Sequence, residues 1–264
     1  MPKRSILFFV SFILLFSSCI PNKDLVYFQG DPILKNTVNK ILNDPYKLQV
    51  NDILDIRLKA NDEKLVALFN QSLNQNTSSV GQLNEANLYF NSYSIDKNGN
   101  IRLPYIGDLN VLGYTEKEVR EKIEEGLAKF FVDMSNIFVT VKLGGIRFTV
   151  LGEVTSPGTL VLFQNQVNII EAIANAGDIT ITGNRKKVTV IRKNLDGTKK
   201  FQMDLTSVSA FDSESFYIQS NDIVYIEPLK QKSWGTGTTG SQTFATIISV
   251  LSLVTTTILL VRNL

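Results

Sequence analysis

The chain has 264 residues, with 27 lysines and arginines against 25 aspartates and glutamates, so its formal net charge is only +2. Nucleic-acid binding calls for a basic stripe, and this balance gives no reason to expect nucleic acid as a partner. Histidine is absent and cysteine occurs once. These counts exclude Ser-His-Asp and Cys-His catalysis, intrachain disulfides and metal sites built on histidine or several cysteines. Any enzyme would have to rely on carboxylates, lysine or hydroxyl groups alone, and we expect no enzyme, no cofactor and no metal site.

The N-terminus resembles a secretory signal peptide, because residues 1–18 join two basic residues, an apolar run at 6–16 and small residues. Cys19 follows directly, in the place of the cysteine in the lipobox of bacterial lipoproteins. That resemblance implies cleavage before Cys19 and acylation of its thiol. Ile20 after the cysteine, rather than aspartate, implies sorting to the outer membrane. An ordinary cleaved signal that leaves a spare thiol is the alternative.

Two stretches show little hydrophobic periodicity. Residues 19–45 include three prolines, and we interpret them as a lipidated tether that lets the folded part stand off the membrane. Residues 61–94 are dense in Asn, Gln and Ser, which is typical of an insertion.

One local pattern occurs twice. Hydrophobic and polar residues alternate on each side of Asn51-Asp52, as in two strands joined at a tight corner, and the pattern returns around Asn221-Asp222. We interpret the two stretches as copies of one structural element within a chain that has no tandem repeat.

The remaining elements follow from turn and capping signals. Asn98-Gly99 predicts a hairpin between 93–95 and 101–103. Thr115 and Glu118 form a capping box, which predicts a helix of about four turns that buries residues at helical spacing. A strand is predicted at 137–143. The helix positions predicted to be buried are Val119, Ile123, Leu127 and Phe130.

From residue 148 the pattern predicts strand, turn, strand, helix, strand, hairpin and strand. Asn168 and Glu171 cap the helix, and Gly177 ends it. We expect Gly107 and Gly158 to serve turns and to have no ligand role.

No charged residue occurs between 233 and 261. A helix over 244–262 would be long enough to cross the roughly 30 Å core of a bilayer, and its hydroxyl side chains gather on one side. We predict that this side faces a shared water-filled pore, although a soluble core helix or a simple anchor remain alternatives. The predicted pore-lining residues are Thr246, Ser249, Ser252 and Thr256.

The stretch before this helix, 231–243, is interpreted as a Gly/Thr linker. Its residues 235–240 match a dinucleotide-binding loop letter for letter, but no strand ends directly before them and no acidic residue follows. Scattered carboxylates leave a glycosidase open in principle, yet most lie at predicted turns, where aspartate is a usual choice.

Several motifs, taken in their order along the chain, resemble those of the outer-membrane polysaccharide export lipoproteins of the Wza type. The first domain has 46–56, GNIRLPYIG at 99–107 and GYT at 113–115, and the second has VLGEV at 150–154 and the helix at 169–177. The resemblance implies an α+β fold with a polysaccharide biosynthesis/export domain at 46–145 and a β-grasp domain of the SLBB (soluble-ligand-binding) type at 146–230. The family usually has glycine where Asn51 and Asn221 stand.

The resemblance also implies a function. The protein would be a subunit of a homo-oligomeric ring that exports capsular polysaccharide or exopolysaccharide across the outer membrane. It would be lipid-anchored among outer-membrane lipids with a periplasmic body, and would work with an inner-membrane polysaccharide co-polymerase. A monomeric membrane-anchored carbohydrate-binding lipoprotein is the alternative.

Overall fold

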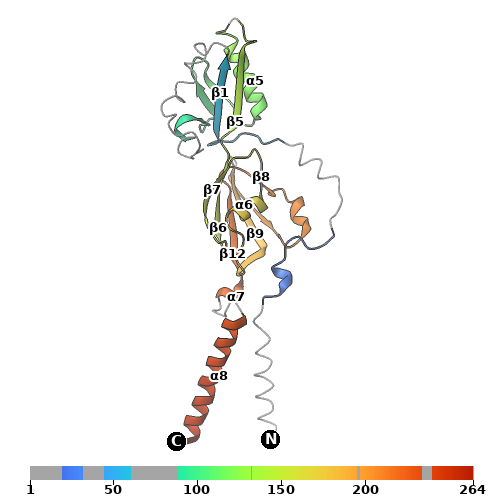
Figure 1. The fold of residues 1–264 in the computed structure, drawn as a ribbon, viewed down its shortest axis with the longest axis vertical. Coiled ribbons are helices and arrows are strands. Elements are labelled where there is room, and N and C mark those ends of the chain that lie inside the picture. Colours follow the sequence, from blue (N-terminus) through green and yellow to red (C-terminus); the bar gives the residue numbers. More distant parts are fainter. Residues whose placement is uncertain are drawn as a thin grey trace.

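The computed structural model describes residues 20–31, 45–60, 89–131, 133–194, 197–233 and 240–263. They form two domains and a long C-terminal helix, which follow one another along a single long axis (Figure 1). Both domains combine helices with β-sheets, so the predicted α+β class is confirmed. The predicted signal peptide, Cys19 and most of the predicted insertion lie outside the described residues.

The first domain is built on a three-stranded antiparallel sheet in the order β2-β1-β5, beside which β3 and β4 form a separate hairpin. The long pair aligns Leu54 with Leu143 and Ala60 with Ile137. Alternate residues of these two strands are buried, as expected for strands with one face on the core. The strands are β1 (Ile53–Ala60), β2 (Tyr93–Ser94), β3 (Asn100–Leu103), β4 (Gly107–Asn110) and β5 (Ile137–Leu143).

The turn at Asn98-Gly99 is present, but the hairpin predicted around it is wrong. Asp96 N–H donates to the Asn100 carbonyl at 2.9 Å, so the chain does reverse there. Beyond this bond, however, β2 pairs with β1 and β3 pairs with β4. Pairing with more distant segments therefore overrides the local turn signal.

Helix α5 (Glu116–Leu127) begins at the predicted capping box. Thr115 N–H donates to the Glu118 carboxylate at 2.7 Å, and Glu118 N–H donates to the Thr115 hydroxyl at 3.3 Å. The predicted fourth turn is wrong, because the helix has 12 residues and Phe130 is 53% exposed. Phe130 N–H bonds to the Leu127 carbonyl only three residues back, so the chain tightens and leaves the helix there. The residues that α5 buries are Val119, Ile123 and Leu127.

The second domain has a five-stranded sheet in the order β10-β9-β12-β6-β7, together with a small β8-β11 pair and one helix. β12 runs parallel to β6, and the other neighbours in the large sheet are antiparallel. The predicted strands, helix and hairpin occur in the predicted order, and the structure adds the short strands β8 and β11. The elements are β6 (Ile146–Gly152), β7 (Gly158–Leu162), β8 (Val167–Asn168), α6 (Ile169–Asn175), β9 (Gly183–Asn194), β10 (Gly197–Met203), β11 (Tyr217–Ile218) and β12 (Ile223–Pro228).

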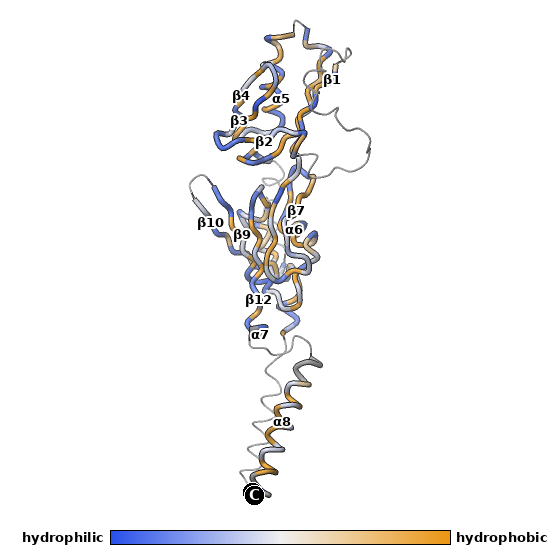
Figure 2. The backbone as a smooth tube through the Cα atoms, turned by 90° about the vertical axis from the view of Figure 1, so that its left-hand side faces the viewer, coloured by the Kyte–Doolittle hydropathy of each residue, from blue (hydrophilic) through white to orange (hydrophobic). Residues whose placement is uncertain are grey.

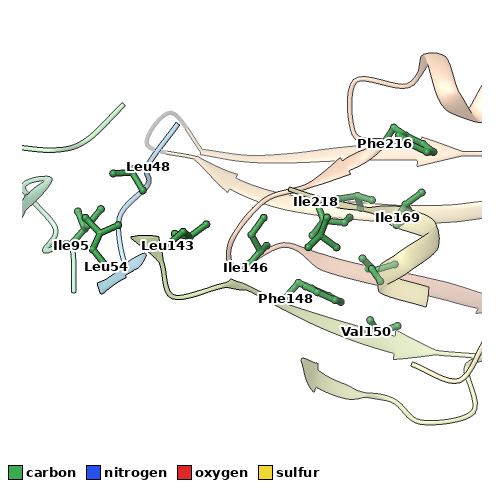
Figure 3. Close-up of a cluster of buried hydrophobic side chains, with 14 of the residues drawn as sticks. Leu48, Leu54, Ile95, Leu143, Ile146, Phe148, Val150, Ile169, Phe216 and Ile218 are labelled. Atoms are coloured by element: carbon green, nitrogen blue, oxygen red, sulfur yellow. The ribbon is translucent and has the colours of Figure 1, made fainter. Parts of the chain in front are cut away.

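A single cluster of buried apolar side chains runs through both domains. Figure 3 shows Leu54 and Leu143 of the first domain leading on to Ile146 and Phe148 of the second. Only two residues separate β5 from β6. The two domains therefore pack directly on each other.

Helix α8 (Gly240–Asn263) extends from this body beyond the short α7 (Lys230–Ser233) (Figure 1). Both helices reach into the predicted linker at 231–243, which is therefore partly helical. Apolar and more polar turns alternate along α8 (Figure 2). Within the described parts of the chain, no helix combines the length and the apolar character needed to cross a bilayer. The membrane span predicted over 244–262 is not supported.

Candidate functional site

Two features stand out as candidate sites: the side of α8 that bears hydroxyl groups, and the junction between the two domains. The four residues predicted to line a pore all lie on α8, within a single regular helix. Apolar side chains of α8 are strongly exposed, among them Val250 at 60% and Leu253 at 70%. The described part of the same chain therefore leaves most of the helix surface uncovered.

The hydroxyl groups of α8 bond to the helix's own backbone. Ser249 donates to the Ala245 carbonyl at 3.0 Å, and Thr256 donates to the Ser252 carbonyl at 2.7 Å. Such bonds to carbonyls one turn back satisfy a hydroxyl without help from water. The hydroxyl-bearing side can therefore face either water or another helix.

Leucines also lie on the hydroxyl-bearing side, which the sequence reasoning missed. Leu253 and Leu260 each come four residues after a predicted pore-lining residue, Ser249 and Thr256, and so share its side of the helix. Both leucines are at least 60% exposed. The predicted polar side is therefore mixed, and it suits contact with neighbouring helices as well as with water.

The repeated Asn-Asp pattern produces two matching turns, which lie against each other at the domain junction. Asn51 and Asn221 both have left-handed backbones, with φ of 70° and 67°. Asparagine tolerates this conformation, which explains why it can stand where the family usually has glycine. Gln49 Nε2 of one turn donates to Gln219 Oε1 of the other at 2.8 Å. The predicted duplication of one structural element is confirmed, and its copies connect the domains.

In both turns the aspartate accepts a hydrogen bond from the backbone N–H three residues earlier. The distance is 2.8 Å from Gln49 to Asp52 and 2.9 Å from Gln219 to Asp222. Both aspartates are almost fully buried, with 2% and 1% of their surface exposed. A buried carboxylate calls for partners, because removing charge from water costs free energy.

The partners of the two aspartates differ. Asp222 forms a two-pronged ion pair with Arg192, whose Nε lies 2.9 Å from Oδ1 and whose Nη2 lies 2.7 Å from Oδ2. Asp52 instead accepts the Tyr46 hydroxyl at 2.9 Å on Oδ2, while its buried Oδ1 has no hydrogen-bond partner among the residues that the structure describes. Burial raises the pKa of Asp52, although the Gln49 N–H and the Tyr46 hydroxyl that bond to its carboxylate act to lower it. Burial also raises the pKa of Tyr46.

The sequence could have revealed part of this junction. Gln49 and Gln219 occupy the same position in the two copies, which is a detectable signal. Arg192 gives no such signal, because it lies 30 residues from the aspartate that it neutralises. Cys19 lies outside the described residues, so its acylation stays a prediction.

The fold therefore defines a two-domain α+β protein with an additional C-terminal helix. Residues 42–143 match the family model for polysaccharide biosynthesis/export proteins, and residues 146–226 match the model for the SLBB domain. The boundary between the two matches coincides with the link between β5 and β6. These two matches confirm the predicted resemblance to polysaccharide export proteins of the Wza type, with one export domain followed by one SLBB domain.

Two curated proteins are similar to the chain, and both are named EPS I polysaccharide export outer membrane protein EpsA. The protein from Ralstonia solanacearum is 26% identical over 187 residues, and that from Ralstonia nicotianae is 26% identical over 188 residues. The alignments cover 70% and 69% of this chain but 48% and 47% of the two relatives. The chain thus spans about half the length of the curated relatives it matches.

Proposed function

We propose that the protein is a lipoprotein subunit of an oligomeric outer-membrane channel that exports capsular polysaccharide or exopolysaccharide. The observation that carries the proposal is the uninterrupted succession of an export domain and an SLBB domain over residues 42–226. Both relatives, whose alignments cover 70% and 69% of the chain, are named as polysaccharide export outer membrane proteins. The described residues form no cluster of metal-binding side chains, and the proposal requires none.

The exposed helix α8 favours an assembly of several copies. An isolated helix gains little stability in water unless it buries an apolar face against a partner. Neighbouring copies of the chain offer such a partner, with the apolar residues in contact and a shared path for the polymer at the centre. In this arrangement the residues nearest the path are Thr246, Ser249, Ser252 and Thr256. Outer-membrane lipids and an inner-membrane polysaccharide co-polymerase are the further partners that we propose.

The test of this function is genetic and physical. Deletion of the gene should abolish surface polysaccharide while the polymer accumulates inside the cell, and the full chain should restore export. The protein extracted in mild detergent should have a mass of several subunits, whereas a carbohydrate-binding monomer would have the mass of one. Normal surface polysaccharide in the deletion strain would refute the proposal.

The side of α8 that faces the polymer path can be tested with single cysteines. Ser252→Cys should react with a water-soluble thiol reagent in the assembled protein, whereas Val254→Cys should be protected by the neighbouring helix. Cys19 is retained in both variants because its thiol is expected to be acylated and so unreactive. Equal labelling of the two positions would contradict the proposed orientation.

The lipid anchor provides a further prediction. If Cys19 is the acylated N-terminus of the mature protein, cells grown with a radioactive fatty acid should label the wild-type chain. Cys19→Ser should lose the label, since no other cysteine is present. The matched control is Ser18→Ala, which keeps a small residue before the cysteine and should remain labelled. Label that persists in Cys19→Ser would disprove acylation at this residue.

A further inference from the structure

The start of the described chain is packed on the second domain, in contrast to the free tether predicted for residues 19–45. We call residues 22–29 the N-terminal strap; it begins with the short 3-10 helix η1 (Asn22–Asp24). Phe28 N–H donates to the Leu205 carbonyl at 3.1 Å, and Gln29 N–H donates to the Thr206 carbonyl at 2.6 Å. These bonds hold the strap along the domain as an added stretch of backbone pairing.

Side chains secure the strap as well. Asp24 forms an ion pair with Lys186 at 2.5 Å. The Tyr27 hydroxyl donates to Asp178 Oδ1 at 2.5 Å, and the Arg185 guanidinium lies 5.1 Å from the centre of the Tyr27 ring. Burial and the bond to Asp178 raise the pKa of Tyr27 to about 12, so this hydroxyl keeps its proton at neutral pH. The strap is thus held at several independent points.

The C-terminal end of the second domain is bonded to the same region as the strap. We call residues 178–182, which lie between α6 and β9, the basal turn. Leu229 N–H donates to the Thr182 carbonyl of this turn at 2.7 Å, just before α7. Glu153 accepts the Thr182 hydroxyl at 2.6 Å and the Lys232 ammonium of α7 at 2.5 Å. The basal turn therefore bonds directly to the strap and to Leu229, and it is linked to α7 through Glu153.

The basal turn also presents an apolar side chain to solvent. Ile181 is 48% exposed, although its neighbours in the turn are engaged in hydrogen bonds with Glu153 and Arg185. Val26 of the strap is 43% exposed, next to the Tyr27 that reaches Asp178. Figure 1 shows η1 and α7 at the same end of the second domain. One exposed apolar residue thus lies in the strap, and another lies in the basal turn to which the strap is bonded.

We propose that this end of the second domain rests on the surface of a lipid bilayer, with Ile181 and Val26 entering its interface. Asn22 comes three positions after Cys19, and an extended chain covers at most about 3.6 Å per residue. An acyl group on Cys19 would therefore hold the strap within about 11 Å of the bilayer, and the strap is fixed to the domain. The proposal rests on the lipid anchor of the proposed function.

The charged and apolar side chains at this end of the second domain suit a membrane interface. Lys23 is exposed at the start of the strap and would meet anionic headgroups, which attract lysine close to a surface. Side chains that enter the boundary between headgroups and acyl chains are typically buried by about 5 to 10 Å. A rigid, anchored end that exposes isoleucine and valine beside lysine can use all of these contacts. The bilayer would then fix the tilt of the domain, which a flexible tether could not do.

The experiment uses tryptophan as a depth reporter in the full, acylated chain. The sequence has one tryptophan, Trp234, so Trp234→Phe provides a silent background for Ile181→Trp or Val26→Trp. Phe138→Trp is the matched control, because Phe138 is 63% exposed and lies at the end of β5 far from the second domain. Each protein is placed in phosphatidylethanolamine and phosphatidylglycerol vesicles, with either plain or brominated acyl chains.

Brominated chains should lower the fluorescence of Ile181→Trp and Val26→Trp at least about twofold, since bromine quenches only at interfacial depth or below. Phe138→Trp should be unaffected. The proposal is overturned if Ile181→Trp is not quenched, if all three reporters are quenched equally, or if the protein does not float with the vesicles. Absent quenching in a protein that floats and still restores polysaccharide export refutes this inference and leaves the proposed function intact.

Discussion

Replacement of Gly152 by alanine is expected to prevent the second domain from folding. A Cβ at this position would lie 2.0 Å from the carbonyl oxygen of Ile226, far inside the distance that two such atoms tolerate. Gly152 also has a φ of +94°, which L-residues rarely adopt. The clash falls where β6 pairs with β12, because Ile226 is the partner of Gly152 in that parallel ladder. Neither strand can move without disrupting the centre of the five-stranded sheet.

The expected cost exceeds about 4 kcal/mol, which is exceptional for a single substitution and comparable with the whole stability of many domains. The measurement is the yield of soluble or detergent-extracted protein, followed by the thermal unfolding midpoint from circular dichroism. Two glycines serve as controls. Gly107→Ala meets no atom within 4 Å but keeps a φ of +82°, so it should cost only about 1 to 2 kcal/mol.

Gly158→Ala is the second control and should leave stability unchanged. Gly158 begins β7, has no left-handed backbone and would place a Cβ in open space. The turn role predicted for Gly158 from the sequence is therefore wrong, whereas Gly107 does require a left-handed conformation. The explanation would be contradicted if Gly152→Ala folded normally while Gly158→Ala failed to fold.

Interactions that are local in sequence were predictable, and those between distant segments were not. The capping boxes at Thr115 and Asn168 need only residues three positions apart, and both are present. The repeated turns were visible because their residue types recur. By contrast, the hairpin around Gly99 was wrong because strand pairing depends on the whole sheet.

The N-terminal strap is a stronger example of contacts between distant segments that the sequence could not predict. Tyr27 and Asp178 are 151 residues apart, and nothing in the composition of the strap distinguishes it from a free linker. Its packing follows from the shape of the second domain, which single-sequence patterns do not contain. The candidate functional surfaces depend on such contacts, so the sequence alone predicted the family better than the site.

Replacement of Asp222 by asparagine is expected to destabilise the protein by about 3 to 5 kcal/mol, because it leaves a buried arginine without its counter-charge. Arg192 and Asp222 have side-chain exposures of only 8% and 0%. Asp55→Asn is the matched control, since Asp55 pairs with Arg57 at 2.9 Å but that arginine is 52% exposed. Exposed pairs contribute at most about 1 kcal/mol, so Asp55→Asn should shift the unfolding midpoint little.

Asp52→Asn should behave in the opposite way to Asp222→Asn, although both aspartates occupy the same place in matching turns. No arginine among the described residues pairs with Asp52, and burial raises its pKa above its usual value. The native state therefore binds the Asp52 proton more tightly than the unfolded chain, in which a carboxyl titrates near pH 3.9. Ionisation of Asp52 then lowers stability progressively as the pH rises from about 4 through its native pKa.

Asparagine removes this ionisation while its side-chain oxygen can still accept the Gln49 N–H and the Tyr46 hydroxyl. At pH 7, Asp52→Asn should be at least as stable as wild type, and its advantage should shrink as the pH falls toward about 4. The difference between the two unfolding midpoints, measured from pH 4 to pH 8, isolates Asp52 from the other titrating groups. A loss of stability at pH 7 as large as that of Asp222→Asn would show that the Asp52 carboxylate has a stabilising partner. In that case, the difference between the two turns would not lie in their charge pairing.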